Sequence, residues 1–260
     1  AWRIADGTVG TGGFTSPGNH DTTANRPAKN RNKTWGFSMT GELDLGFANL
    51  TSITAARRGR NHSNFDVDGG PLDLVNIDAP VKTRQFQQEI RLGSKTTHPF
   101  AWQLGGFYFN SKVAALQTQS GDAFAPANLR QIGIRSNLET TSYALFGELS
   151  YAITPTTTLT GGLRYTQDKR DFDGNQTPIL LSGINLATTS VVSTLKYSEF
   201  TYRAALRQDI TDNINMYASI NRGFKAGAYS LQSPTSPSVK PQFIMAYEVG
   251  LKSELFDRRL

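Results

Sequence analysis

TWGFSMTGELDLGF, residues 34–47, places a hydrophobic residue or a glycine at every second position. One alternating set consists of Trp35, Phe37, Met39, Gly41, Leu43, Leu45 and Phe47; the other consists of Thr34, Gly36, Ser38, Thr40, Glu42, Asp44 and Gly46. Successive side chains of a β-strand point to opposite faces, whereas an α-helix repeats every 3.6 residues. The stretch therefore predicts a strand with one hydrophobic face.

The same alternation recurs along the chain, most clearly at 159–168 and 199–207. It predicts strands at 34–47, 50–60, 82–93, 100–113, 139–152, 157–169, 196–209, 214–224 and 243–253. Tight turns rich in Asn, Asp, Pro and Ser alternate with long links near 61–81, 114–138, 170–195 and 225–242. Residues 1–33 have no hydrophobic period, and we expect an extracellular loop or a disordered arm there.

Two architectures use strands with one hydrophobic face. A soluble β-sandwich turns that face onto a shared core, with strands of about 5–6 residues and short connections. A membrane barrel turns it to lipid, needs about 9–11 tilted residues per strand, and alternates short periplasmic turns with long extracellular loops. The strand lengths and the alternating links favour the barrel, while the sandwich remains the alternative.

Aromatic placement favours the barrel as well. Tyr143 and Tyr151 begin and end one hydrophobic row, and their separation projects to about 20 Å along the membrane normal, close to the roughly 25 Å between two aromatic girdles. Nine strands leave an open edge, and single-chain bacterial barrels have an even number of strands. We therefore predict an all-β, antiparallel transmembrane β-barrel of which this chain supplies about nine strands.

Composition excludes several other classes of protein. The chain has no cysteine, which excludes disulfides and thiolate metal sites. Its 27 basic and 21 acidic residues are dispersed, so we expect no nucleic-acid partner. No hydrophobic run has the length of a transmembrane helix, and the N-terminus lacks a signal-peptide pattern, so we expect a processed chain or a piece of a longer one.

Several motifs resemble those of a known family, in order and in spacing. They are YASINRGFKAG at 217–227, KPQ at 240–242 and YEVGLKSELFD at 247–257, preceded by FQQEIRLG at 86–93, WQLGGFYF at 102–109, YALFGELSY at 143–151 and LTGGLRYTQD at 159–168. Together they resemble the β-barrel of TonB-dependent outer-membrane receptors over most of residues 34–260.

The resemblance implies a barrel of about 22 strands whose lumen holds a plug domain. It implies that 34–260 is a partial barrel domain without the plug and the final strands, in the outer membrane of a Gram-negative bacterium. It also implies uptake of a ferric siderophore or similar iron complex, energised by the TonB complex through an absent N-terminal region. Uptake of cobalamin, haem or an oligosaccharide, a passive porin and a barrel enzyme remain alternatives.

Catalytic and metal chemistry have few candidate residues. His20, His62 and His98 are the only histidines, and a barrel hydrolase needs a nucleophile with an oriented base at the rim of the lumen. We expect no enzyme. Asp66, Asp68 and Asp73 around Gly69-Gly70 resemble a calcium loop, but the fifth-position ligand and the closing Glu are missing. We therefore expect neither structural calcium nor a resident cofactor, since the ferric chelate would be cargo.

Ligand binding is the function that remains. An anionic ferric chelate suits Arg or Lys side chains with aromatic partners near the extracellular rim. The candidates at predicted strand ends and loops are Arg57, Arg58, Arg60, Arg170, Arg222, Lys225 and Tyr229.

Overall fold

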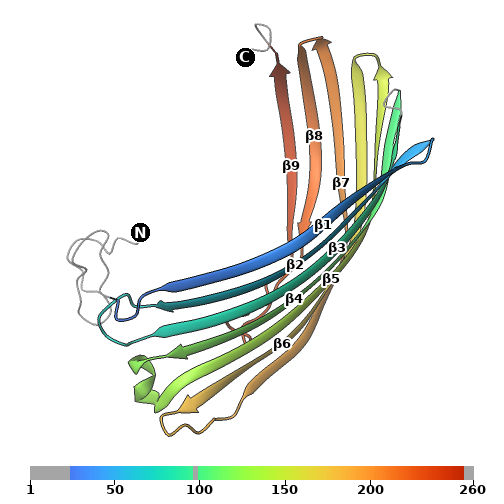
Figure 1. Cartoon of the computed structure of the whole chain (residues 1–260). Helices are drawn as coiled ribbons and strands as arrows, with labels where there is room; N and C mark the ends of the chain where they lie inside the picture. The colour runs from blue at the N-terminus through green and yellow to red at the C-terminus, as the bar shows by residue number, and fades with distance from the viewer. Residues whose placement is uncertain (1–23, 96–98, 255–260) are drawn as a thin grey trace, which may run out of the picture.

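The computed structural model describes residues 24–95 and 99–254. In these ranges the chain forms nine strands, every one antiparallel to its neighbours, in a single sheet whose strand order follows the sequence (Figure 1). The strands are β1 (Lys29–Asp44), β2 (Ala48–Asp66), β3 (Asn76–Ser94), β4 (Phe100–Ser120), β5 (Leu129–Thr154), β6 (Thr157–Leu180), β7 (Thr189–Thr211), β8 (Ile214–Lys225) and β9 (Gln242–Ser253). The only described helix is the short 3₁₀ helix η1 (Asp122–Ala127), and no described helix has the length and hydrophobicity to cross a membrane.

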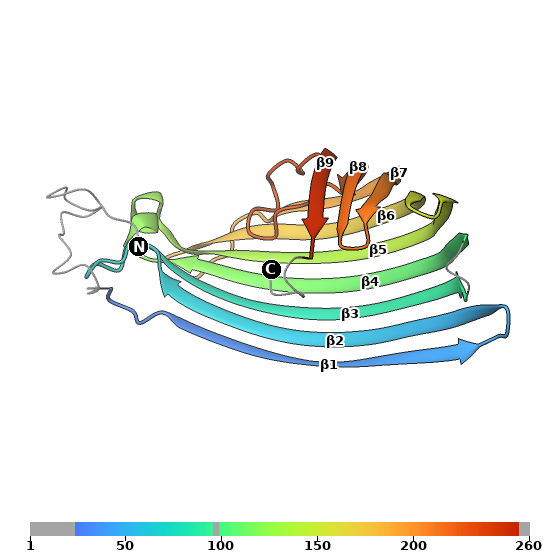
Figure 2. The ribbon, with the colours of Figure 1, turned by 90° about the horizontal axis from the view of Figure 1, so that it is seen from above.

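The sheet is curved and open. β1 and β9 form its two edges, and the strands between them bend into a trough (Figure 2). A barrel closes such a sheet by pairing its edge strands, and strand tilt accompanies that closure. The described strands therefore form part of a barrel wall, as the sequence predicts.

The strands extend much farther than predicted at the end with the long links. β5 has 26 residues and β6 has 24, and they pair without interruption from Gln131↔Ile179 to Ala152↔Thr158. Most of the predicted links 114–138 and 170–195 is thus strand, and this part of the prediction was wrong. Polar and hydrophobic side chains are mixed on both faces there, which hides the period of two, while pairing with a neighbouring strand still satisfies the backbone N–H and C=O groups.

β1 also differs from its predicted range. It begins at Lys29, inside the segment predicted as a loop or arm, while residues 1–23 of that segment lie outside the described ranges. It ends at Asp44 because Gly46 takes a positive φ of 85° and its N–H donates to Asp44 Oδ1 at 2.7 Å. Leu45 and Phe47 consequently belong to the turn instead of the strand.

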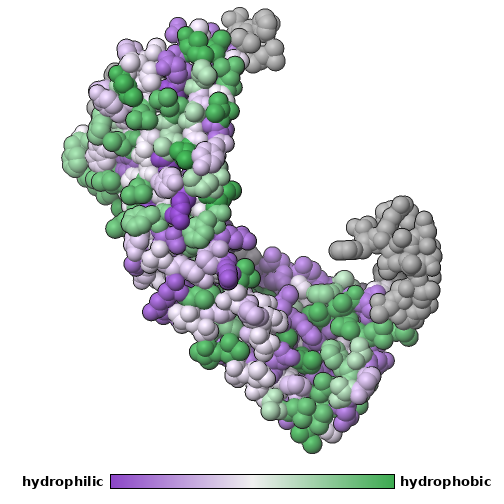
Figure 3. All heavy atoms as spheres, turned by 180° about the vertical axis from the view of Figure 1, so that it is seen from behind, coloured by the Kyte–Doolittle hydropathy of each residue, from purple (hydrophilic) through white to green (hydrophobic). Residues whose placement is uncertain are grey.

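The strand register defines two faces of the sheet. Paired residues share a face, so Met39, Thr54, Gln88, Tyr108 and Tyr143 lie in one row. This face, called the outer face, carries most of the large exposed hydrophobic side chains of the strands. Figure 3 shows hydrophobic side chains gathered at the short-turn end of the sheet, more hydrophilic ones in its middle, and further hydrophobic ones at the opposite end. The opposite face is called the inner face.

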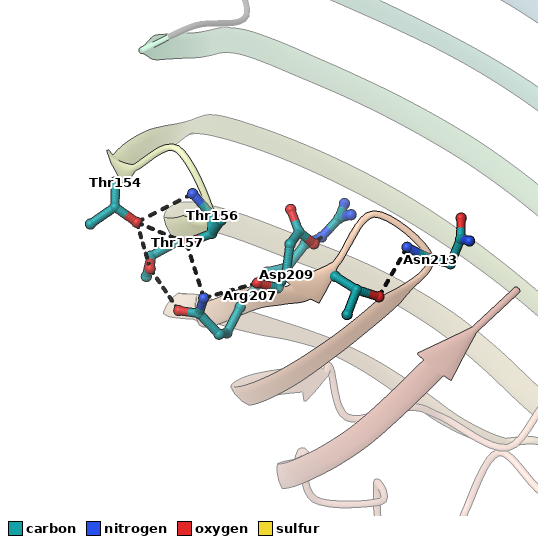
Figure 4. A network of polar contacts seen from close by, with 8 residues as sticks. Thr154, Thr156, Thr157, Arg207, Asp209 and Asn213 are labelled. Carbon is teal, nitrogen blue, oxygen red and sulfur yellow. Dashed lines mark hydrogen bonds and ion pairs between the residues drawn. The ribbon is translucent and has the colours of Figure 1, made fainter.

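Polar contacts join neighbouring turns at the short-turn end (Figure 4). The Thr154 hydroxyl donates to Thr157 Oγ1 at 2.8 Å, and Thr157 donates to Gln208 Oε1 at 2.6 Å. Gln208 Nε2 completes the link by donating to Thr156 Oγ1 at 3.1 Å. The β5–β6 turn is thereby tied to β7 by side chains that hydrogen-bond one another.

Candidate functional site

The segment between β8 and β9, residues 226–241, lies against the inner face of the sheet; we call it the β8–β9 loop. The ring of Tyr229 stacks on that of Phe172 with centroids 4.6 Å apart and an interplanar angle of 11°. The Tyr229 hydroxyl donates to Ser193 Oγ at 2.8 Å, and Ser136 Oγ donates to the Leu231 carbonyl at 2.9 Å. The loop is therefore attached to β5, β6 and β7 by one ring stack and two hydrogen bonds.

Two of the most buried side chains of the sheet contact this loop. Phe172 is 2% exposed and Ser136 is fully buried. Pro234 of the loop is buried against Gly174, where an added Cβ would lie 2.5 Å from the Pro234 Cβ. A larger residue at position 174 would thus displace the loop, so the glycine is required for this packing.

The base of the loop depends on Gly227. Ala228 and Val239 exchange two backbone hydrogen bonds of 3.1 and 2.7 Å and close the loop into a narrow neck. A Cβ on Gly227 would lie 2.3 Å from both the Val239 carbonyl oxygen and the Tyr197 hydroxyl. Gly227, the last residue of the sequence motif 217–227, therefore allows the chain to pass close to the inner face of β7.

Arg222, from the same motif, occupies the place where β8 separates from β7. The pairing of these strands stops at Tyr202↔Arg222. Beyond that point the Arg222 guanidinium donates to the Phe200 carbonyl, lies 3.4 Å from Glu199 Oε2 and covers the Phe243 ring at 4.9 Å. The side chain thus satisfies a β7 carbonyl that the β8 backbone no longer reaches.

Most cations in the middle of the inner face have a partner within the sheet. Two ion pairs join Arg170 to Asp168 at 2.9 Å and Arg203 to Glu148 at 3.5 Å, and Arg91 pairs with Glu89. The Arg170 and Asp168 side chains are only 20% and 11% exposed. These charges are consequently neutralised by the chain itself.

Arg164 is held by aromatic rings. Its guanidinium carbon lies 5.3 Å from the Phe107 ring centroid and 5.4 Å from that of Phe146, as expected for cation–π contacts. Gly105 makes room for this arrangement, because a Cβ there would lie 2.3 Å from the Phe146 ring. The prediction from sequence missed this site, although Arg164 stands in the polar set of the clearly alternating stretch 159–168.

The structure divides the seven predicted ligand-binding residues between the two faces. Arg57, Arg170 and Lys225 belong to inner-facing rows, and Tyr229 lies in the β8–β9 loop. The remaining three, which are Arg58, Arg60 and Arg222, belong to outer-facing rows. Arg170 lies well within β6 instead of at the start of a loop.

Arg57 is the predicted residue with the most open surroundings on the inner face. It is exposed and forms no ion pair with any residue in 24–95 or 99–254. A hollow of about 440 Å³ beside it is lined by Thr34, Ser38, Gln85 and Gln87, among others. Gly36 leaves this space open, since a Cβ there would lie 3.7 Å from the Arg57 side chain and only 3.1 Å from the Ala56 carbonyl oxygen.

His62 is the one histidine within the described ranges, and it lies on the outer face. Its Nε2 is 2.6 Å from Asp78 Oδ1. His20 and His98 fall on residues that the structure does not describe. The His62–Asp78 pair therefore does not face the inner wall, where a lumenal substrate would be.

Asp66, the last residue of β2, and Asp68 shape the loop between β2 and β3. Asp66 Oδ1 accepts the N–H groups of Asp68 and Gly69, and Asp68 accepts those of Gly70 and Val75. Partial burial and the neighbouring Asp68 raise the pKa of Asp66. Burial has the same tendency at Asp68, but the hydrogen bond from the Val75 N–H helps to lower the pKa of that carboxyl. Within the described residues no group of three acidic or histidine side chains has a metal-binding arrangement.

A family model described as TonB dependent receptor-like, beta-barrel, matches residues 2–260. The chain belongs to the TonB-dependent receptor family. The predicted family, the all-β barrel fold and the outer-membrane location in Gram-negative bacteria are thereby confirmed. The family and its structural neighbours are transport receptors instead of enzymes, as expected.

Solved structures of this TonB-dependent receptor fold resemble the chain over most of its length. The ferric yersiniabactin uptake receptor FyuA from Yersinia pestis has a TM-score of 0.71 at 14% identity, over 86% of this chain and 34% of FyuA. The ferric-catecholate import receptor Fiu from E. coli K12 has a TM-score of 0.62 at 14% sequence identity, over 96% of this chain and 44% of Fiu. The siderophore receptor PiuA from Acinetobacter baumannii has a TM-score of 0.59 at 17% sequence identity, over 89% of this chain and 38% of PiuA. The chain thus spans less than half the length of these neighbours, and the likeness shows the fold.

Proposed function

We propose that this chain forms part of the wall of a receptor that takes up a ferric siderophore or a similar iron complex. The observation that carries the proposal is Arg57, an exposed cation without an ion-pair partner among the described residues, on an inner face where Arg91, Arg164, Arg170 and Arg203 are paired or stacked. Anionic oxygens of a chelate are suitable partners for such a guanidinium, because charge-assisted hydrogen bonds are strong.

The β8–β9 loop would contribute aromatic contact to the same cargo. Tyr229 is docked on Phe172, and Lys225 at the end of β8 is exposed on the inner-facing row. Cations and aromatic rings together suit large, planar, anionic ligands. The position of this loop on the inner face supports a role in holding cargo within the wall.

The same proposal includes the source of energy for uptake and the partners of the receptor. The TonB complex would act through an N-terminal region, and the receptor's own plug domain would contact the inner face. Outer-membrane lipid would contact the outer face, where Trp35, Phe37 and Leu43 are all more than half exposed. The iron complex is cargo in this scheme, and neither a resident cofactor, nor structural calcium, nor a nucleic-acid partner has a part in it.

Uptake by the intact receptor tests the proposal. Cells with this receptor as their only route for iron complexes would be given a panel of radiolabelled ferric siderophores, with and without a functional TonB complex. We expect TonB-dependent accumulation of at least one chelate. Accumulation of cobalamin, haem or an oligosaccharide without any iron chelate, or passive entry independent of TonB, would contradict the proposal.

Adjacent arginines provide a matched pair of variants. Arg57→Gln removes the inner cation, whereas Arg58→Gln removes its neighbour on the outer face. We expect Arg57→Gln to weaken binding of the transported chelate about tenfold, corresponding to the loss of one charge-assisted contact, and Arg58→Gln to leave it unchanged. Equal loss in both variants would contradict a lumenal role for Arg57.

A further inference from the structure

β7 extends well beyond β8 on the side of the sheet that carries the long links (Figure 1). β7 has 23 residues and β8 has 12, and the pairing of these two strands stops at Tyr202↔Arg222. β6 stays paired with β7 as far as Gln176↔Thr189. The stretch 189–201 of β7 therefore has a neighbouring strand on one side only.

Alternate residues of this stretch direct their backbone N–H and C=O groups away from β6. In an antiparallel pair both backbone groups of one residue point to the same neighbouring strand, and those of the next residue point to the other side. The Asp209 N–H donates to the Thr156 carbonyl just before β6, and the Phe200 carbonyl accepts from Arg222 of β8. Odd positions of β7 thus face β6, and even positions face the β8 side.

The even positions beyond Phe200 have no strand to pair with. We call them the open β7 edge; they are Ser190, Val192, Thr194, Lys196 and Ser198. Within 24–95 and 99–254, no residue hydrogen-bonds to the backbone of this edge from the β8 side. The open β7 edge is therefore a row of backbone donors and acceptors that is available to another chain.

The β8–β9 loop does not cover the open β7 edge. It leaves the plane of the sheet and contacts β7 through the inner-facing side chains of Ser193 and Tyr197, which occupy odd positions. Two of its own backbone groups are used in the neck, where Ala228 and Val239 bind each other. The loop thus lies on the inner face and leaves the edge of the strand free.

The open β7 edge lies above the lipid. Tyr202 is about nine residues from the short-turn end of β7 at Thr211. At ~3.3 Å per residue and a tilt near 40°, this distance projects to about 23 Å, close to the roughly 25 Å height of the lipid-facing band of such barrels. The long links of these barrels are extracellular. The edge is consequently in water on the extracellular side, where a partner from outside the cell reaches it.

The sequence of the edge does not protect it from pairing. Exposed edge strands usually carry charged residues, prolines or bulges that prevent another chain from adding to the sheet. The first part of β7, TSVVSTL at 189–195, has no charged residue, no proline and no glycine, and the β6–β7 register runs through it without irregularity. Thr and Val also favour strand formation. This stretch is therefore well suited to accept a further strand.

We propose that the open β7 edge binds an extended segment of a separate polypeptide, which adds to the sheet as a strand on the extracellular side. Main-chain hydrogen bonds supply the affinity in strand addition, and side chains at alternate positions supply the specificity. Val192 is 80% exposed on the outer face and suits a hydrophobic residue of the segment. Lys196 lies opposite Lys169, whose ion-pair partner is Asp171, so an acidic residue of the segment beside Lys196 is favoured.

Other occupants fit this edge less well. Two receptors in one membrane have the same orientation, and joining their equivalent edges about a two-fold axis along the membrane normal would continue the outer face of one wall as the inner face of the other. A small ligand would satisfy only a few of the backbone groups, whereas an extended peptide satisfies the whole row. The proposal is independent of the cargo that the receptor transports.

Hydrogen exchange in the intact receptor, kept in detergent, tests the proposal. The probe is a synthetic peptide that spans 190–198, alternates Val with Thr and carries one Glu beside Lys196; the control peptide has the same sequence with alternate backbone amides N-methylated. Val192→Pro removes one N–H group of the open β7 edge and keeps the pairing with β6, because proline is tolerated where the N–H of an edge strand points away from the ladder. Val192→Thr keeps the N–H group, and heat-modifiable migration on gels confirms that each variant is folded.

We expect the amides of the open β7 edge to exchange rapidly in the receptor alone and about tenfold more slowly with the peptide, because exchange reports the opening of hydrogen bonds. Val192→Pro should weaken binding of the peptide about tenfold, as expected for the loss of a backbone hydrogen bond at the centre of the added strand. Val192→Thr should leave binding unchanged, and the N-methylated peptide should not bind.

Three results would overturn the proposal. Slow exchange at these amides without peptide would show that the receptor's own chain covers the edge. Equal binding of the two peptides would show that backbone hydrogen bonds do not hold the segment. Binding to Val192→Pro as strong as to the unchanged receptor would place the peptide elsewhere.

Discussion

The two faces of this sheet treat positive charge differently. On the inner face Arg91, Arg170 and Arg203 have acidic partners, and Arg164 lies between two phenylalanine rings. On the outer face of β1–β3, no ion pair with a residue in 24–95 or 99–254 is formed by Lys33, Arg58, Arg60, Lys82 or Arg84, although Lys82 and Arg84 line one hollow with Glu139 and Asp171. The comparison indicates that most inner charges serve the wall, while these outer cations and the inner Arg57 are open to partners from outside the chain.

The largest expected effect comes from the packed part of the inner face. Phe172→Ala removes a ring that is 2% exposed and stacked on Tyr229. We expect a loss of about 3 kcal/mol in the free energy of unfolding, because truncating a buried Phe leaves a cavity, together with faster proteolysis within 226–241. Urea unfolding of the intact receptor in detergent and limited proteolysis measure the two effects.

Tyr165→Ala is the control for Phe172→Ala, since Tyr165 is an aromatic residue of the same strand on the outer face. It should leave cleavage within the β8–β9 loop unchanged. Faster cleavage in both variants would show that the loop responds to general weakening of β6 and not to loss of the stack.

A smaller effect is expected from breaking an inner ion pair. Asp168→Asn leaves the Arg170 guanidinium without its partner in a site where the two side chains are 20% and 11% exposed. We expect a loss of about 2 kcal/mol, below the 3–5 kcal/mol typical of a fully buried pair, and partial recovery in Asp168→Asn with Arg170→Gln. Urea unfolding of these variants is the measurement.

Arg84→Gln provides the outer reference for that measurement, and its unfolding free energy should change by less than about 0.5 kcal/mol, as for other surface substitutions. A loss in Arg84→Gln as large as that in Asp168→Asn would remove the distinction between the two faces.

The smallest effect should come from the inner pair that is most open to solvent. Arg203 and Glu148 lie 3.5 Å apart with side chains 54% and 44% exposed. A double-mutant cycle of Arg203→Gln and Glu148→Gln should give a coupling of about 0.5 kcal/mol or less that decreases with added salt, because water screens exposed pairs. A coupling as large as that of Asp168 with Arg170 would show that exposure does not rank the inner pairs.

Prediction from sequence succeeded where one face meets lipid. The stretch 34–47 and the row from Tyr143 to Tyr151 alternate clearly, because lipid tolerates hydrophobic side chains and the other face is polar. Beyond the lipid both faces mix polar and hydrophobic residues, such as Phe172 on the inner face and Val192 on the outer face, so the alternation disappears although the strands continue, as the extra lengths of β5 and β6 show. The stretch 50–60 shows the same loss of contrast, because it has hydrophobic residues in both alternating sets. The sequence therefore does not indicate that Arg57 and Arg58 lie on different faces of the sheet.

The sequence by itself determined the strands that cross the membrane, their antiparallel order and the family, because these depend on a local period of two and on short motifs. Only the tertiary structure decided which face each arginine occupies, because that depends on register with a neighbouring strand. It also decided that residues 226–241 fold onto β5, β6 and β7, through contacts such as Tyr229 with Phe172 that join residues far apart in the chain. Contacts of this kind leave no periodic signal in the sequence.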